Sequence, residues 1–390
     1  MVRTGLERVV AGDTDAVARL RGRRIGLLAH PASVDARFRH ARHAMDAAGA
    51  RLGALFGPEH GYGGEAQDMV GVESARDPAT GAPIHSLYGD REECLTPRPE
   101  WLEGLDAVVV DLQDVGSRYY TYVWTAALML KACAARGIAT VVLDRPNPLG
   151  GDVMEGAPQR PGYRSFVGLY DVPVRHGMTL AEILRYVCSV EGLPSEALEV
   201  VPMQGWRRSM RWEDTGLPWV APSPNMPTLD TARVYPGGCL LEGTNLSEGR
   251  GTTRPFEIWG APSLDGARLA TSIAVPGAAL RPLTFLPMFQ KHAGRICGGV
   301  QVHVTDERVF RPYAAYLRLI AEARRGMATT FRWRTEPYEF VADRPAIDLL
   351  TGGPEYRTLV EGEGDVAAWI AEQDRGAAAF EASRRAFLLY

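Results

Sequence analysis

The chain is poor in lysine and lacks the features of several common protein classes. Lys131 and Lys291 are the only lysines among 390 residues, so arginine carries nearly all of the positive charge. A net charge of −4 gives no basic field of the kind that recruits nucleic acid. No window approaches the roughly 18 uncharged apolar residues of a membrane span, and the N-terminal segment lacks the apolar stretch of an export signal. We therefore expect a cytoplasmic protein that binds neither nucleic acid nor membranes.

Motifs for cofactors and covalent catalysis are also missing. The five cysteines are scattered without C-x-x-C spacing, which disfavours a metal site or a disulfide framework. The sequence contains no G-x-G-x-x-G, no phosphate-binding G-x-x-x-x-G-K-[ST], no G-x-S-x-G elbow and no H-E-x-x-H. The remaining inventory of carboxylates, histidines, arginines and amides suits acid–base chemistry on a polar substrate. We expect no cofactor and no metal.

Alternating apolar runs and helical segments predict a parallel sheet. The segment 119–136 has helical composition and stands between two apolar runs, and a strand–helix–strand unit of this length makes a sheet parallel. The runs that we interpret as buried strands are 24–29, 52–56, 107–112 and 138–143.

The fold class predicted is α/β, in two domains. We expect a Rossmann-like parallel-sheet domain without a dinucleotide over residues 1–205 and a smaller C-terminal α/β domain over residues 206–390. The stretch 219–260 is too apolar for disorder and reads as a long ordered loop, which is usually functional in a compact domain.

Polar residues follow each predicted strand at its carboxyl end. His30 follows the first strand and Glu59-His60 the second, while the other two run into the segments 111–114 and 144–147. Ligands of open parallel sheets bind outside the carboxyl ends of the strands. Glu59 stands between Gly57-Pro58 and a glycine-rich stretch, a setting that can hold a general acid or base at the mouth of a cleft, with His60 tuning its proton.

Several long motifs resemble one bacterial family. GPEHG (57–61), DLQDVGSRYYTY (111–122), LDRPNPLGG (143–151), GLYDVPVRHGMT (168–179) and EGTNLSEGRGTTRPFE (242–257) are similar to motifs of the NamZ-type exo-β-N-acetylmuramidases, in the same order. The resemblance implies a cleft between two domains and release of N-acetylmuramic acid from the non-reducing end of peptidoglycan fragments. The partner would be a muropeptide or a MurNAc-GlcNAc disaccharide. Members are often exported, which conflicts with the cytoplasmic expectation.

Carried over by motif, Glu59 is the favoured catalytic acid/base. Asp114 is the first candidate for the partner carboxylate, with Glu155 and Glu248 as alternatives, and substrate-assisted attack by the acetamido group is a further option. The lactyl carboxylate of muramic acid needs a cation, for which we expect Arg118 or Arg175; alternatively, Arg118 pairs structurally with a neighbouring aspartate. Further predicted sugar contacts are Tyr119, Asp144, Asn147, His176, Asn225, Asn245 and Arg250.

Two interpretations remain open. Trp212, Trp219 and Trp259 could stack on sugar rings or pack between domains. A non-catalytic carbohydrate-binding protein would keep the cleft and use Glu59 only as a hydrogen-bond acceptor.

Overall fold

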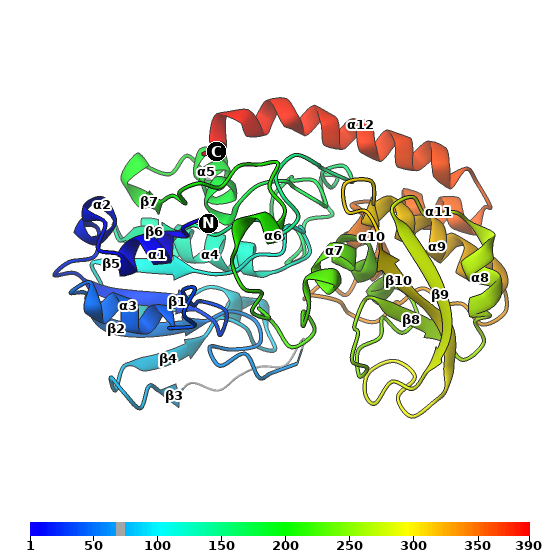
Figure 1. Ribbon diagram of the computed structural model, residues 1–390, viewed down its shortest axis with the longest axis horizontal. Coiled ribbons are helices and arrows are strands. Elements are labelled where there is room, and N and C mark those ends of the chain that lie inside the picture. Colours follow the sequence, from blue (N-terminus) through cyan, green and yellow to red (C-terminus); the bar gives the residue numbers. More distant parts are fainter. Residues whose placement is uncertain (68–74) are drawn as a thin grey trace.

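The computed structural model describes residues 1–67 and 75–390 (Figure 1). Asp68, which comes shortly after the glycines that follow Glu59, lies outside them, as do residues 70–74 at the start of the segment 70–95, whose composition predicts a loop. A seven-stranded sheet has the order β3-β4-β2-β1-β5-β6-β7, and only its edge strand β3 is antiparallel. Without β3, the order is that of a Rossmann fold. The strands are β1 (Arg24–Ala29), β2 (Arg51–Gly57), β3 (Ala75–Arg76), β4 (Pro83–Ser86), β5 (Ala107–Asp111), β6 (Ala139–Leu143) and β7 (Leu198–Val201).

Helices cover both faces of this sheet because its central strands are apolar on both sides. In β5, Val108 and Val110 pack toward α4 and α5, while Ala107 and Val109 pack toward the helices α1 and α3. The helices of this unit are α1 (Gly5–Val10), α2 (Thr14–Ala18), α3 (Ala41–Ala47), α4 (Tyr122–Ala134) and α5 (Leu180–Glu191). Thr179 and Glu182, which have the sequence spacing of a capping box, form one at the start of α5. The Rossmann-like prediction is confirmed.

A smaller unit contains a three-stranded antiparallel sheet of order β8-β10-β9. The prediction of one long loop over 219–260 was wrong, because α7, a 3₁₀ turn and most of β8 lie within it. Pro236 and the two glycines at the end of α7 disfavour helix, so the sequence did not indicate one there. The helix begins after Thr228, whose side chain caps its first turn. The elements of this unit are α7 (Leu229–Gly238), β8 (Ile258–Ala261), α8 (Gly266–Ser272), β9 (Ala278–Phe285), β10 (Cys297–Val304), α9 (Pro312–Gly326), α10 (Ala346–Thr351) and α11 (Glu355–Glu361). The short helix α6 (Trp212–Thr215) lies against the larger unit, where the Val2 backbone donates to the Thr215 carbonyl at 2.9 Å.

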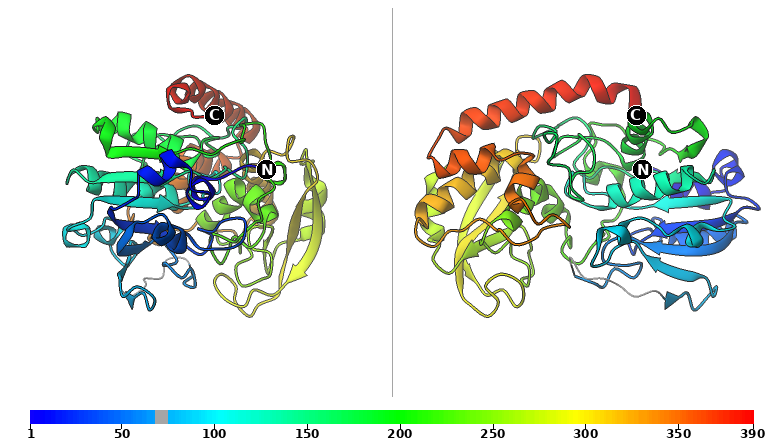
Figure 2. Two further views of the ribbon diagram at one scale, coloured as in Figure 1. Left: turned by 60° about the vertical axis from the view of Figure 1, so that its left-hand side comes forward. Right: turned by 180° about the vertical axis from the view of Figure 1, so that it is seen from behind.

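The last helix, α12 (Val366–Arg384), runs from the smaller unit back to the larger one, as Figures 1 and 2 show. The chain then ends against the larger unit, where the Tyr390 hydroxyl donates to Asp144 Oδ2 at 2.8 Å. The C-terminal tail therefore packs on the N-terminal sheet unit, and the division at 205/206 stays a prediction. Within the described part of the chain, no helix is both long and apolar enough to cross a membrane.

Candidate active site

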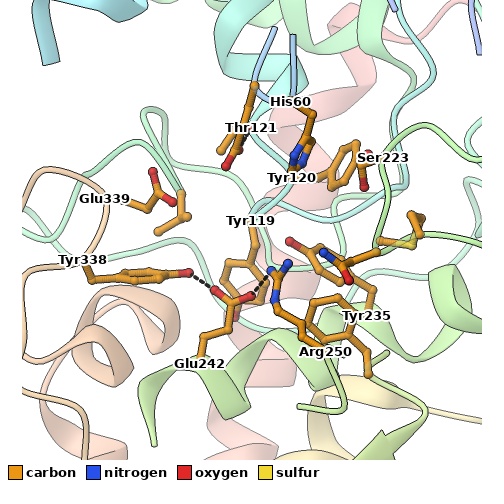
Figure 3. A pocket seen from close by; sticks show the side chains of 15 residues that line it. His60, Tyr119, Tyr120, Thr121, Ser223, Tyr235, Glu242, Arg250, Tyr338 and Glu339 are labelled. Atoms are coloured by element: carbon orange, nitrogen blue, oxygen red, sulfur yellow. Dashed lines mark hydrogen bonds and ion pairs between the residues drawn. The ribbon is translucent and has the colours of Figure 1, made fainter. Parts of the chain in front are cut away.

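A polar pocket lies between the two units. The larger unit contributes the end of β2 and the turn before α4, and the smaller unit contributes α7, the 3₁₀ turn after it and two loops (Figure 3). Its walls carry acidic, hydroxyl, amide and aromatic side chains together with one arginine. The lining residues are Glu59, His60, Tyr119, Tyr120, Thr121, Val167, Ser223, Asn225, Met226, Tyr235, Glu242, Arg250, Phe256, Tyr338 and Glu339.

Glu59 reaches the pocket because the chain turns sharply after β2. A Cβ atom on Gly57 would lie 2.2 Å from the Tyr62 backbone nitrogen, so only glycine permits this fold-back. His60 adopts a left-handed backbone with φ of 72°, which is rare for a residue other than glycine. The Thr121 hydroxyl, just before α4, donates to Glu59 Oε2 at 2.7 Å. A buried carboxylate is thereby held in one orientation at the carboxyl end of the sheet.

The opposite wall is built around Arg250. Arg250 Nη2 donates to Glu242 Oε1 at 2.7 Å, and the Tyr338 hydroxyl donates to Glu242 Oε2 at 2.7 Å (Figure 3). The guanidinium carbon lies 5.1 Å from the centre of the Phe256 ring, a cation–π geometry. The pocket thus faces a carboxylate on one side and a cation on the other.

Tyrosine hydroxyls supply many of the remaining polar contacts. Burial raises the pKa of Tyr235 and Tyr338 well above 10, so both stay protonated at neutral pH. Protonated hydroxyls can donate to or accept from a ligand. Glu339 also lines the pocket and has a left-handed backbone, with φ of 45°. Strained residues of this kind cluster at functional sites, where surrounding structure maintains them.

Five predicted site residues meet in this pocket: Glu59, His60, Tyr119, Asn225 and Arg250. His60 Nδ1 lies 2.9 Å from the Ala66 carbonyl oxygen, which fixes the ring. Asn225 Nδ2 donates to Gln67 Oε1 at 2.9 Å, so this amide connects the segment before α7 to the glycine-rich turn after β2. The Tyr119 hydroxyl donates to the Leu350 carbonyl.

The two arginines expected to bind a carboxylate lie outside the pocket. Arg118 is fully buried and donates to the carbonyl oxygens of Ala157, Val172 and Leu350. Arg175 pairs with Glu155 at 3.2 Å and donates to the Leu149 carbonyl. These bonds join backbone segments and balance a buried carboxylate. The arrangement gives Arg118, Arg175 and Glu155 structural surroundings and does not support their predicted roles.

Other strand-end residues are likewise engaged away from the pocket. Asp144 accepts from Thr179 and Tyr390, and Asn147 Nδ2 donates to the Met178 carbonyl. Asp114 Oδ2 accepts from the Gly116 backbone and lies 3.4 Å from Nε2 of the buried His176. Neither the Asp114 role as second carboxylate nor the predicted sugar contacts of Asp144, Asn147 and His176 are supported by these positions.

Two predicted residues of the smaller unit, Asn245 and Glu248, lie outside the pocket lining, whereas Arg250 is part of it. Asn245 bonds Thr330 and Arg332 in a neighbouring loop, and Glu248 lies behind Arg250 beside Lys291. The tryptophans pack against other aromatic rings: Trp212 meets Trp219 edge-on, and the fully buried Trp259 lies near Tyr316. The aromatic walls of the pocket are tyrosines and Phe256 instead.

Several pocket residues were missed from sequence. Tyr120 and Thr121 stand in the same motif as Tyr119, and Glu242 opens the motif that contains Arg250, so motif membership was an available signal. Tyr338 and Glu339 lie about 90 residues beyond Arg250 in the sequence, and no local pattern marks them. Among the described residues, no group of three His, Cys, Asp or Glu side chains is placed to hold a metal ion.

The fold and the pocket together define an α/β protein with a polar pocket between two units. The chain belongs to the exo-β-N-acetylmuramidase NamZ family: the models of its N-terminal and C-terminal parts match residues 25–230 and 233–390. The peptidoglycan β-N-acetylmuramidase NamZ of Bacillus subtilis (strain 168) is 40% identical over 393 residues, covering 100% of this chain and 91% of that protein.

Two crystal structures of DUF1343 family proteins from Bacteroides fragilis NCTC 9343 have the same fold. They superpose with TM-scores of 0.86 and 0.79 at 29% and 28% identity. Each comparison covers 100% of this chain and 99% of the other. The likeness extends over both units and the returning helix.

Proposed function

We propose that this protein hydrolyses the β-glycosidic bond between a terminal N-acetylmuramic acid residue and the next sugar of a peptidoglycan fragment. Family membership and the activity named for the B. subtilis relative support this proposal. The predicted non-reducing-end specificity belongs to this proposal.

The observation that carries the proposal is Glu59. Its buried carboxyl group lines the pocket and is oriented by the Thr121 hydroxyl at 2.7 Å. In a glycosidase, such a carboxyl group protonates the leaving oxygen as the bond breaks. Of the other pocket carboxylates, Glu242 is held within the wall by Arg250 and Tyr338, whereas Glu339, which accepts a hydrogen bond from the Tyr88 hydroxyl at 3.3 Å, sits on strained backbone. Glu339 is therefore the better candidate for the second catalytic group.

Arg250 is the arginine that lines the pocket, and we assign it to the lactyl carboxylate that distinguishes muramic acid from glucosamine. A guanidinium can bind a carboxylate through two parallel hydrogen bonds. The assignment replaces Arg118 and Arg175.

The test compares two chromogenic β-glycosides, of N-acetylmuramic acid and of N-acetylglucosamine. We expect turnover of the muramic substrate only, and loss of that turnover in Glu59→Gln. Binding of both sugars without product release would favour a carbohydrate-binding protein. Turnover of the gluco substrate alone would overturn the role of the lactyl group.

A further inference from the structure

We infer that Lys291, outside the pocket, is a positioning residue that sets the charge of the Arg250 wall and thereby favours an anionic sugar. The inference rests on the proposed function, because it assumes that Arg250 reads the lactyl carboxylate. Its geometry is independent of that assumption.

Lys291 belongs to the loop between β9 and β10 and turns inward. The residues on either side, Gln290 and His292, both have left-handed backbones, with φ of 64° and 60°. The loop is tied to the segment that carries Arg250, since the Met288 backbone donates to the Gly251 carbonyl at 3.0 Å. Lys291 is thus flanked on both sides by residues with strained backbones. This indicates that the loop is shaped to place the Lys291 ammonium group.

The ammonium group meets three acceptors. Lys291 Nζ donates to the carbonyl oxygens of Leu241 and Leu246 at 2.9 and 3.2 Å, and it lies 3.1 Å from Glu248 Oε2. An ammonium group is a compact charge whose three donors all leave from one atom, which suits three oxygens that converge on a single point. Lys291 is one of only two lysines in the sequence.

From Lys291 the contacts continue to the pocket. Glu248 Oε1 lies 3.3 Å from Arg250 Nε, and Arg250 Nη2 donates to Glu242 at 2.7 Å. The Tyr338 hydroxyl donates to the other carboxylate oxygen of Glu242 and ends this row of contacts. Glu248 and Arg250 are buried, so their charges are weakly screened by water.

The formal charges of the four ionised groups in this row of contacts cancel. Glu242 and Glu248 carry two formal negative charges, and Arg250 and Lys291 carry two positive ones. Although burial alone would raise it, the pKa of Glu248 is held below its usual value by Lys291 and Arg250. Without Lys291, two carboxylates would face one guanidinium and the wall of the pocket would become negative. An anionic substrate would then bind more weakly, while a neutral sugar would be little affected.

The experiment measures kcat and KM on the muramic glycoside for Lys291→Gln and Lys291→Met. Gln removes the charge and keeps a hydrogen-bond donor, so it decides the outcome if the Met variant does not fold. Lys131→Met is the matched control, because Lys131 is the other lysine and pairs with Glu191 on the surface of the larger unit. We expect KM to rise about tenfold in both Lys291 variants, with kcat within about threefold, and no change in the control.

Two further measurements separate a charge effect from a packing effect. Inhibition by free N-acetylmuramic acid should weaken in Lys291→Gln, whereas inhibition by its lactyl amide should not. The double variant Glu248→Gln/Lys291→Gln restores the balance of charge, and its KM should return toward the wild-type value. Equal KM for Lys291→Gln and wild type, or equal loss for both inhibitors, would overturn the inference. If wild-type protein turns over neither glycoside, the proposed function fails instead.

Discussion

Two polar clusters occupy the carboxyl edge of the same sheet, and only one of them lines the pocket. At the ends of β5 and β6, Arg145 binds Asp111 through two hydrogen bonds, of 2.6 and 2.9 Å, and Asp144 accepts from Thr179 and Tyr390. At the end of β2, Glu59 meets a hydroxyl on one side and the pocket on the other.

The difference shows that convergence at a sheet edge locates a site without saying which groups use it. In the β5 and β6 cluster, Arg145 balances the charge of Asp111 and two hydroxyl groups bond Asp144, so these groups are engaged within the larger unit. The β2 cluster faces groups supplied by the second unit. We expect mutations in the first cluster to affect stability and mutations in the second to affect turnover.

The largest effect is expected from Glu59→Gln. Loss of a general acid typically costs about 10²–10⁴ in rate, so kcat on the muramic glycoside should fall by that factor while the melting temperature stays near that of wild type. Glu65→Gln, an exposed residue of the following turn, is the matched control and should retain full activity. Turnover of the Glu59 variant within about tenfold of wild type would show that another group is the acid.

Arg175→Met should act in the opposite way. It leaves Glu155 buried without its cation, which costs about 3–5 kcal/mol of the free energy of unfolding. Urea denaturation measures this loss, and kcat per folded molecule should stay close to wild type. The control is Arg164→Met, whose pair with Asp171 is exposed and contributes at most about 1 kcal/mol. A stable but inactive Arg175 variant would place this arginine in the active site after all.

The contrast between the clusters also explains what sequence could predict. The strand β5 is a short run of buried aliphatic residues, and Thr179 with Glu182 is a local capping pattern, so both can be recognised from residues that are close in the sequence. Glu59 was found because a strand end, a proline turn and glycines are adjacent in the chain. Each of these signals is local.

The remaining features depend on contacts between distant segments. Whether Arg118 faces a ligand or three carbonyls is decided by residues up to 232 positions away. Glu339 enters the pocket from a loop with no periodic pattern, and α7 was hidden by its own proline. Residue type indicates the chemistry available, but only the packing of the two units decides which arginine is used.

A third prediction concerns the pH dependence of stability. Burial, reinforced by Glu182, raises the pKa of Asp144 from 3.8 to about 7. Between these values the native state binds more protons at this site than the unfolded state, so its contribution to stability falls as pH rises from 3.8 to about 7 and is flat outside that window. Asp144→Asn should remove this dependence. The free energy of unfolding of the variant, measured by urea titration, should therefore rise relative to that of wild type by a few kcal/mol between pH 4 and pH 8. A constant difference across that range would contradict the raised pKa.

The smallest effect is expected from Arg250→Lys, which tests the arginine assignment directly. Lysine keeps the positive charge but loses the planar fork, so KM for the muramic glycoside should rise about tenfold with kcat within about threefold. Arg254→Lys is the matched control, since Arg254 is largely exposed and lies outside the pocket lining. An unchanged KM would mean that the carboxylate is read elsewhere. A rise in KM confined to Arg250 would show that the second unit, rather than the sheet edge, selects the sugar.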